Sequence, residues 1–166
     1  MNTHKEIVFK VRHYYAQFLS GIQDHASAGE YYELAADILR NNPAEQAKFA
    51  LESYLGGLNY SIAAKYEASN RMLNQALSVY AQMLPDRLDK YVDTSIALCR
   101  NYGFTKEYGK ALEILAKAEN SFRRVISQTR WGNSPFQRKY LIPTETICRI
   151  GSKLPTGCRH LQSSSR

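Results

Sequence analysis

The sequence lacks any apolar run long enough to cross a membrane, because a spanning helix needs about 20 predominantly apolar residues. The first 15 residues, MNTHKEIVFKVRHYY, mix charged and apolar residues at helical spacing. They contain no separate apolar core of the kind that a secretory signal peptide carries. We therefore expect no transmembrane segment and a cytoplasmic location.

Cysteine is scarce: the chain has Cys99, Cys148 and Cys158, an odd number spread widely along the sequence. A disulfide framework is therefore not expected, and the apolar core must hold the fold. Cys148, Cys158 and His160 lack the spacing and the fourth ligand of a common zinc site. The sequence predicts no bound metal.

Sequence signatures of catalysis are missing as well. There is no P-loop, glycine-rich dinucleotide turn, nucleophile elbow or HExxH pair. The only glycine doublet, Gly56-Gly57, lies inside a helical pattern, and the four histidines do not cluster in the sequence. We predict a protein that is not an enzyme and has no cofactor.

Acidic residues are almost absent from the C-terminal part. Residues 120–166 contain nine Lys or Arg and one acidic residue, Glu145, whereas residues 1–119 contain 13 Lys or Arg and 14 Asp or Glu. The net charge of +7 therefore belongs to the tail.

A repeat with an offset of 42 residues is present along most of the chain. It relates KYEASNRMLNQALSVY at residues 65–80 to EYGKALEILAKAENSF at residues 107–122. Large and small residues recur at this offset in three copies, and two prolines do so between copies: Phe18, Tyr60 and Tyr102; Ser27, Ser69 and Ala111; Tyr31, Leu73 and Leu115; Ile38, Tyr80 and Phe122; Pro43 and Pro85. A fixed period of this length is typical of helical repeat proteins.

Each copy predicts two helices. Apolar residues recur every three or four positions, and Pro43 and Pro85 mark where one helical hairpin ends and the next begins. We expect an all-α fold in which residues 1–126 form a solenoid of about three hairpins. A plain six-helix bundle is the alternative, but it does not explain aromatic residues, small residues and prolines that coincide at one offset.

The third copy resembles the tetratricopeptide repeat (TPR) family, in its 42-residue form. Its most specific stretch is CRNYGFTKEYGKALEILAKA. The second copy carries the resemblance through Gly57, Tyr60, Tyr66, Ser69, Leu73 and Ala76. The first copy departs from the pattern, because Tyr15 stands at the small position and Leu34 at an alanine position. The resemblance covers residues 8 to 126.

This resemblance implies a non-catalytic protein-protein interaction module, such as an adaptor, regulator or chaperone. Such a module binds a peptide or an amphipathic segment of a partner in a concave groove. The groove positions carried over from the family are Arg12, His13, Ala16, Tyr54, Leu55, Leu58, Asp93, Ala97 and Arg100. These residues do not form a Lys/Asn/Arg carboxylate clamp, so we expect an apolar ligand. The alternative at each position is packing between hairpins or plain solvation.

Residues 127–166 are expected to form a basic capping segment and a flexible tail. Aromatic residues accompany a basic patch, which comprises Arg123, Arg124, Arg130, Trp131, Arg138 and Lys139. Cations beside aromatic rings can contact phosphates and stack on bases, so the rival function is nucleic-acid binding, with the helices used for dimerisation or sensing. The simpler interpretation is a capping helix whose basic residues face the solvent. An uncovered solenoid end would also allow a homodimer.

Overall fold

The computed structural model describes residues 3–128, within the first of the two units, Met1–Gln128, into which the chain divides. This part contains six α-helices and no strand, which confirms the all-α prediction. The helices are α1 (Thr3–Gly21), α2 (His25–Leu39), α3 (Gln46–Ile62), α4 (Tyr66–Gln82), α5 (Leu88–Phe104) and α6 (Tyr108–Gln128). The predicted capping segment and tail lie outside the described residues.

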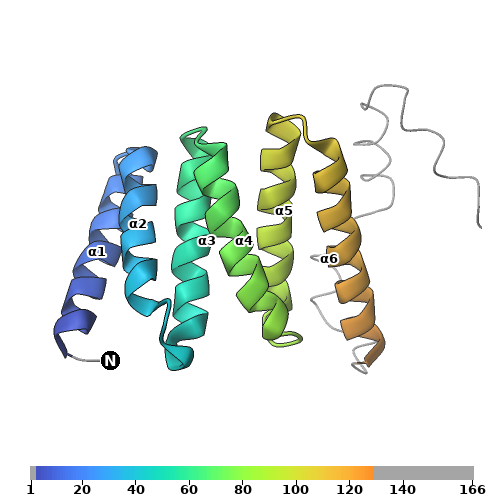
Figure 1. Cartoon of the computed structure of the whole chain (residues 1–166), viewed down its shortest axis with the longest axis horizontal. Helices are drawn as coiled ribbons and strands as arrows, with labels where there is room; N and C mark the ends of the chain where they lie inside the picture. Colours follow the sequence, from blue (N-terminus) through green and yellow to red (C-terminus); the bar gives the residue numbers. More distant parts are fainter. Residues whose placement is uncertain (1–2, 129–166) are drawn as a thin grey trace, which may run out of the picture. The chain divides into compact units, whose positions relative to one another are not determined.

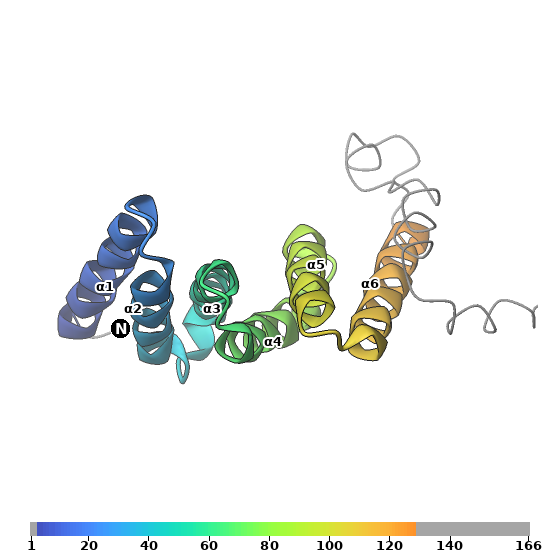
Figure 2. The ribbon, with the colours of Figure 1, turned by 90° about the horizontal axis from the view of Figure 1, so that it is seen from above.

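Each helix packs on the helix that follows it in the chain, so that the six form a row (Figure 1). Seen from above, α1, α3 and α5 lie on one side of the row, and α2 and α4 lie on the other (Figure 2). Pro43 starts a short 3-10 helix, Pro43–Glu45, between α2 and α3, and Pro85 lies between α4 and α5. Both prolines therefore separate hairpins, as the repeat predicted.

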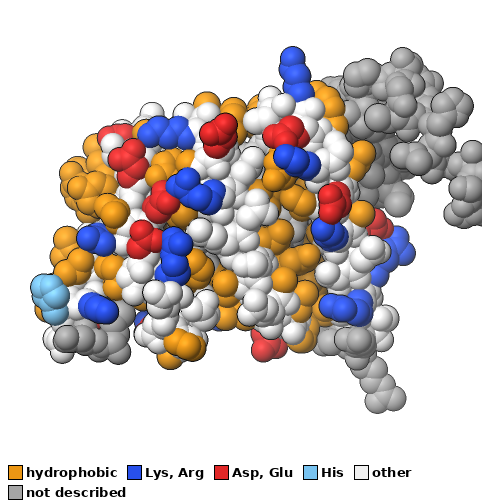
Figure 3. All heavy atoms as spheres, in the orientation of Figure 1, with side chains coloured by type: hydrophobic (Ala, Val, Ile, Leu, Met, Phe, Trp, Pro, Cys, Tyr) orange, Lys and Arg blue, Asp and Glu red, His pale blue; other side chains and the backbone are white. Residues whose placement is uncertain are grey.

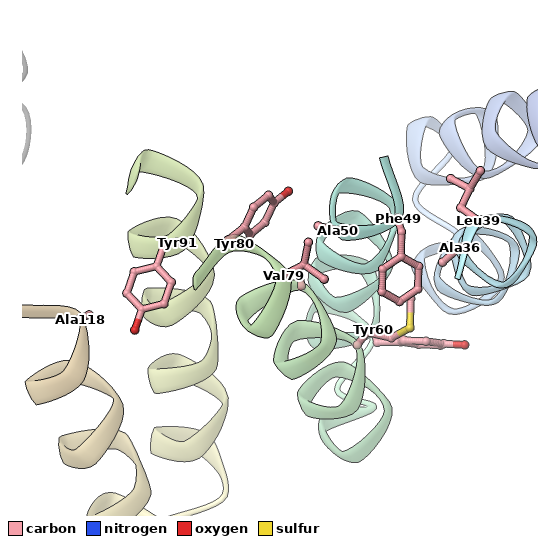
Figure 4. Close-up of a cluster of buried hydrophobic side chains, with 11 residues drawn as sticks. Ala36, Leu39, Phe49, Ala50, Tyr60, Val79, Tyr80, Tyr91 and Ala118 are labelled. Carbon is pink, nitrogen blue, oxygen red and sulfur yellow. The ribbon is translucent and has the colours of Figure 1, made fainter. Parts of the chain in front are cut away.

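The core has two clusters of buried side chains, and the larger one continues from α2 to α6 (Figure 4). Leu39, Phe49, Tyr60, Met72 and Tyr80 are its large members, and alanines fill the spaces between them. Small residues opposite large ones let neighbouring helices approach closely.

The three turns inside the hairpins are alike. Gln23, Ala64 and Lys106 adopt left-handed backbone conformations, with φ of 66°, 57° and 62°. In each turn the next amide donates to a carbonyl five residues earlier: Asp24 to Leu19, Lys65 to Tyr60 and Glu107 to Tyr102, at 2.9, 2.9 and 2.8 Å. This is the Schellman arrangement that ends a helix.

These turns correct the predicted register of the first copy. Gln23 and Ala64 are 41 residues apart, whereas Ala64 and Lys106 are 42 apart. Leu19, not Phe18, is therefore the equivalent of Tyr60; Leu19 is buried and Phe18 is 59% exposed. With the offset of 41, each first-copy residue that we had matched at an offset of 42 is replaced by the residue that follows it in the sequence.

The shift removes both irregularities of the first copy. Ala16, rather than Tyr15, corresponds to Gly57 and Cys99, and Ala35, rather than Leu34, corresponds to Ala76 and Ala118. Ala16 and Ala35 have no exposed surface, whereas Tyr15 and Leu34 are 44% and 41% exposed. The small positions of all three hairpins are thus occupied by small residues.

Candidate interaction surface

The outer side of α3 carries a stripe of apolar side chains, here called the α3 stripe, formed by Leu51, Leu55, Leu58 and Ile62. Their spacing of four, three and four residues places them on one face of the helix. Leu55 and Leu58 are half-buried, whereas Leu51 and Ile62 are 37% and 65% exposed. Leu58 also packs against a buried cluster formed by Leu73, Ala97 and Leu98. The two central residues of the stripe therefore pack partly against the protein, whereas its two end residues are exposed to solvent.

A hollow of about 740 Å³ continues from the end of the α3 stripe towards α5. Its walls come from α3, α4 and α5, and the residues that line it are Ser61, Ile62, Tyr66, Arg100, Gly103 and Phe104. The rings of Tyr66 and Phe104 stack with centroids 5.5 Å apart. Phe104 nevertheless stays 66% exposed. The hollow is therefore mostly apolar, with one cation at its rim.

Arg100 is the cation at this rim. Its side chain is exposed, and no hydrogen bond or ion pair to another described residue holds it. An arginine free to use its planar fork can bind a carboxylate through two parallel hydrogen bonds. The surface can therefore recognise an apolar segment that carries an acidic group.

The predicted groove residues of α3 and α5 occupy this surface in part. Leu55, Leu58 and Arg100 lie on it, and Asp93 lies half-buried on α5, two turns before Arg100. Tyr54 packs instead against the core, with the Lys90 ammonium 5.9 Å from its ring centroid. Ala97 is only 7% exposed and belongs to a buried cluster with Leu73 and Leu98, which corrects its assignment to the groove.

The three predicted groove residues of α1 do not serve as an open groove surface. Ala16 is fully buried, so it cannot touch a ligand. Arg12 donates to the carbonyl of Leu34 at 2.8 Å and therefore ties α1 to α2. His13 is bound by a carboxylate of α3, described next. The corrected offset of 41 residues explains why Arg12, His13 and Ala16 do not line a groove. With this offset, the α1 residues equivalent to Leu55 and Leu58 are Tyr14 and Gln17.

His13 and Glu52 form a partly buried pair between α1 and α3. The His13 Nδ1 atom lies 2.9 and 3.0 Å from the two Glu52 carboxylate oxygens, and Gln17 Nε2 lies 3.0 Å from Nε2 of the same ring. Glu52 is only 2% exposed. Burial raises the pKa of the Glu52 carboxyl, and the His13 ring opposes that rise. The pair joins two hairpins and is not available to a ligand.

Sequence reasoning missed Leu51, Ile62, Phe104, Tyr14 and Gln17. Four are apolar or aromatic, and such residues are ordinarily assigned to the core, so their exposure could not be read from composition. The signal that could have found them is the repeat itself. With the first offset set at 41, Gln17, Leu58 and Arg100 are equivalent, and Ile62 and Phe104 are equivalent.

Only two residues of the predicted basic patch lie in the described part of the chain. Arg123 forms an ion pair with Glu119 at 2.7 Å, one turn earlier in α6, and Arg124 is exposed. Arg130, Trp131, Arg138 and Lys139 lie outside the described residues.

Residues 3–128 contain no group of three or more side chains that could hold a metal ion. Cys99 is half-buried; its thiol donates to the Ala111 carbonyl at 3.3 Å, and burial raises its pKa to about 11. Cys148, Cys158 and His160 lie outside the described residues. No described helix combines the length and the apolarity that crossing a membrane requires.

No protein-family model matches the chain, and no curated protein or solved structure is significantly similar to it.

Proposed function

We propose that residues 8–126 form a tetratricopeptide-like array of three helical hairpins and that the protein acts through it as a non-catalytic interaction module. Three like turns at offsets of 41 and 42 residues support the repeat. The corrected register supports it further, since Ala16 and Ala35 then take the two positions at which the first copy departed from the pattern. Three repeats also meet the minimum for a stable stack.

The α3 stripe is the observation that carries this function. A helix of a folded domain normally turns its apolar face to the core, yet α3 also presents Leu51 and Ile62 to solvent. The apolar hollow beside Phe104 extends the same surface across α5. An amphipathic helix of a partner, with apolar residues three and four positions apart, fits a surface of this kind.

Arg100 indicates which charged group the partner segment carries. It lies at the rim of the hollow without a described acidic partner, so a carboxylate on the bound segment would satisfy it. The partner segment is therefore apolar on one face and acidic beside that face. Its affinity should depend mainly on apolar area and only weakly on salt, because one exposed charge pair contributes little.

A defined peptide tests this proposal. The probe is a labelled helix of about 18 residues, long enough to follow α3, with leucines at positions i, i+3, i+4 and i+7 and glutamates beside them. Fluorescence anisotropy measures its binding to the full chain. We expect Leu55→Glu combined with Ile62→Glu to weaken binding at least tenfold, because burying one such side chain stabilises by about 1.5–3 kcal/mol.

Two controls make the result specific. Ala81→Glu adds a single carboxylate at an exposed position of α4, in the other layer, and should leave binding unchanged. A peptide of the same composition with a scrambled order should bind no variant. Equal binding of the scrambled peptide, or full binding by the stripe variant, would overturn the proposal.

Nucleic-acid binding through the basic patch stays the rival. None of the contacts made by the described residues favours it, since Arg123 is already paired with Glu119. Titration of a random duplex at two salt concentrations distinguishes the two functions, because neutralising several phosphates makes affinity fall steeply with salt. Tight, salt-sensitive duplex binding in the absence of peptide binding would establish the rival.

A further inference from the structure

The outward side of α1 exposes six large apolar side chains, a surface here called the α1 face. Its residues are 44–64% exposed: Ile7, Val11, Tyr14, Tyr15, Phe18 and Ile22. Hydrophobic side chains accordingly gather at the left edge of the molecule, over α1 (Figures 1 and 3). The Tyr15 ring contacts the ring of Tyr31 in α2, with centroids 4.6 Å apart, yet all six side chains stay exposed. Six such residues on one helix are far more than the scattered apolar residues of an ordinary surface.

The repeat allows residues of the α1 face to be compared with the equivalent residues of α3 and α5. Val11, Tyr15 and Phe18 are equivalent to three α3 residues that are all buried: Glu52, Gly56 and Asn59. In α5 the equivalent residues are also buried: Thr94, Leu98 and Asn101. These three positions, at the centre of the α1 face, therefore correspond to a surface that α3 and α5 keep from solvent.

The contacts of these equivalents identify the surface as the one that stacks on the preceding hairpin. Asn59 lies 2.9 Å from His25 of α2, and Asn101 donates to Ser69 and Asn70 of α4. α1 has no preceding hairpin among the described residues. It also carries the aromatic Phe18 where α3 and α5 carry a buried asparagine, so its partner is apolar there and does not supply the polar contacts made at the other two junctions.

We propose that the α1 face is covered by the α1 face of a second copy of this chain, which makes the protein a two-fold symmetric dimer. Ile7, Val11, Tyr14 and Phe18 follow the four-three-four spacing of a coiled-coil seam, which is complementary to another helix with the same spacing. None of the six residues of the face is charged, so two copies do not repel each other there.

The size of the face suits a stable dimer. With exposures of 44–64%, the six side chains present roughly 600 Å² in each copy, because an aromatic side chain alone can bury 150–250 Å². Two copies would together bury about 1,200 Å², which is the lower limit for specific protein interfaces. The same patch on both subunits closes the assembly at two chains.

The order of large and small residues favours an antiparallel pair. With the helices antiparallel, Phe18 of each copy meets Ile7 of the other, and Tyr14 meets Val11, so each layer combines a larger with a smaller side chain. A parallel pair would place the two Phe18 rings together and leave two Val11 side chains facing each other. The helix dipoles also favour the antiparallel arrangement.

Sedimentation equilibrium of the full chain tests the dimer. We expect the wild-type chain to be dimeric at micromolar concentration and Val11→Glu combined with Phe18→Glu to be monomeric, with unchanged helix content by circular dichroism because both residues are exposed. Leu112→Glu is the matched control: it adds a carboxylate at a residue of α6 that is 50% exposed and should leave the dimer intact.

Three results would overturn the proposal: a wild-type monomer up to millimolar concentration, a dimer that survives in the double variant, or growth beyond two chains that Leu112→Glu abolishes. The last would mean that α6 of one copy stacks on α1 of the next.

Disulfide trapping in chains without the native cysteines tests the orientation. A mixture of Ile7→Cys and Phe18→Cys chains should cross-link, whereas Phe18→Cys chains cross-linked to each other would contradict the antiparallel pair.

Discussion

At the scale of single residues, two glycines of α3 set how closely neighbouring helices approach. A Cβ atom at Gly57 would lie 2.6 Å from Cγ of the fully buried Leu73, and one at Gly56 would lie 2.8 Å from Cε of Met72. The Gly56-Gly57 doublet is therefore explained by close packing against α4 and, at Gly56, also against α2. The sequence alone supported this interpretation, because the doublet lies inside a helical pattern.

Gly57→Ala should lower the free energy of unfolding by about 1–2 kcal/mol, because overpacking of about 1–3 kcal/mol exceeds the gain in helix propensity of up to about 1 kcal/mol. Gly103→Ala is the control. No atom from outside its own helix lies within 4 Å of its Cβ position, so this substitution should show only the stabilising gain in helix propensity. Urea unfolding measures both variants. Equal effects of the two substitutions would show that close packing at Gly57 is not limiting.

Glu52 is the second residue whose environment matters. Its pKa is raised above the ordinary value of 4.5, chiefly by burial. The folded state therefore holds a proton that the unfolded state has already lost, so the contribution of this group is fully present below pH 4.5 and is lost as the pH rises through the folded-state pKa. Stability should fall over that window.

Glu52→Gln removes the titrating group while keeping its shape, so it isolates this effect. The unfolding free energy of the wild-type chain minus that of the variant should decrease as the pH is raised from about 4.5, measured by urea unfolding at a series of pH values. An increase with pH would mean that pairing with His13 outweighs burial and that the carboxyl pKa is lowered in the folded protein.

At the scale of helices, the sequence predicted most of the fold. Amphipathic spacing and the prolines located six helices and the connections between hairpins, since both signals are local. It failed at the register of the first hairpin. α1 has apolar residues on both its buried and its exposed sides, so Tyr15 and Phe18 matched the pattern as well as Ala16 and Leu19 did. Periodicity alone cannot show which of two apolar faces is buried.

The junction between the second and third hairpins depends on one buried polar side chain. Asn101 has no exposed surface; it accepts from the hydroxyl of Ser61 and donates to Ser69 and Asn70, at 2.6 and 2.9 Å. Ser69 in turn donates to the carbonyl of Gly57 at 2.6 Å. This network joins α3, α4 and α5, and it was not predictable because its members lie about 30 to 40 residues apart in the sequence.

Asn101→Ala should lower the free energy of unfolding by about 2–3 kcal/mol, because it leaves buried hydrogen-bonding groups without their partner. Asn74→Ala serves as the control, since Asn74 is exposed and donates only to a carbonyl of its own helix; its effect should stay within about 0.5 kcal/mol. Thermal unfolding compares the two. A small effect at Asn101 would show that the network does not hold the junction.

At the scale of the whole array, two apolar surfaces on different helices have different expected partners. The α3 stripe lies beside Arg100, which has no acidic partner among the described residues, and this suits a foreign acidic amphipathic segment. The α1 face is uncharged and occupies the stacking position, which suits a second copy. Substitutions on α1 should therefore change the oligomeric state without abolishing peptide binding, and substitutions on α3 should do the reverse.

The most direct test of the central claim is affinity capture from the native lysate, with and without nuclease. The chains to compare are the wild type, Leu55→Glu combined with Ile62→Glu, the Ala81→Glu control, and a chain ending at Gln128. We predict a protein partner that survives nuclease and removal of residues 129–166, remains with Ala81→Glu, and is lost with the folded α3 variant. Capture that requires the C-terminal residues and disappears with nuclease would contradict the proposed function.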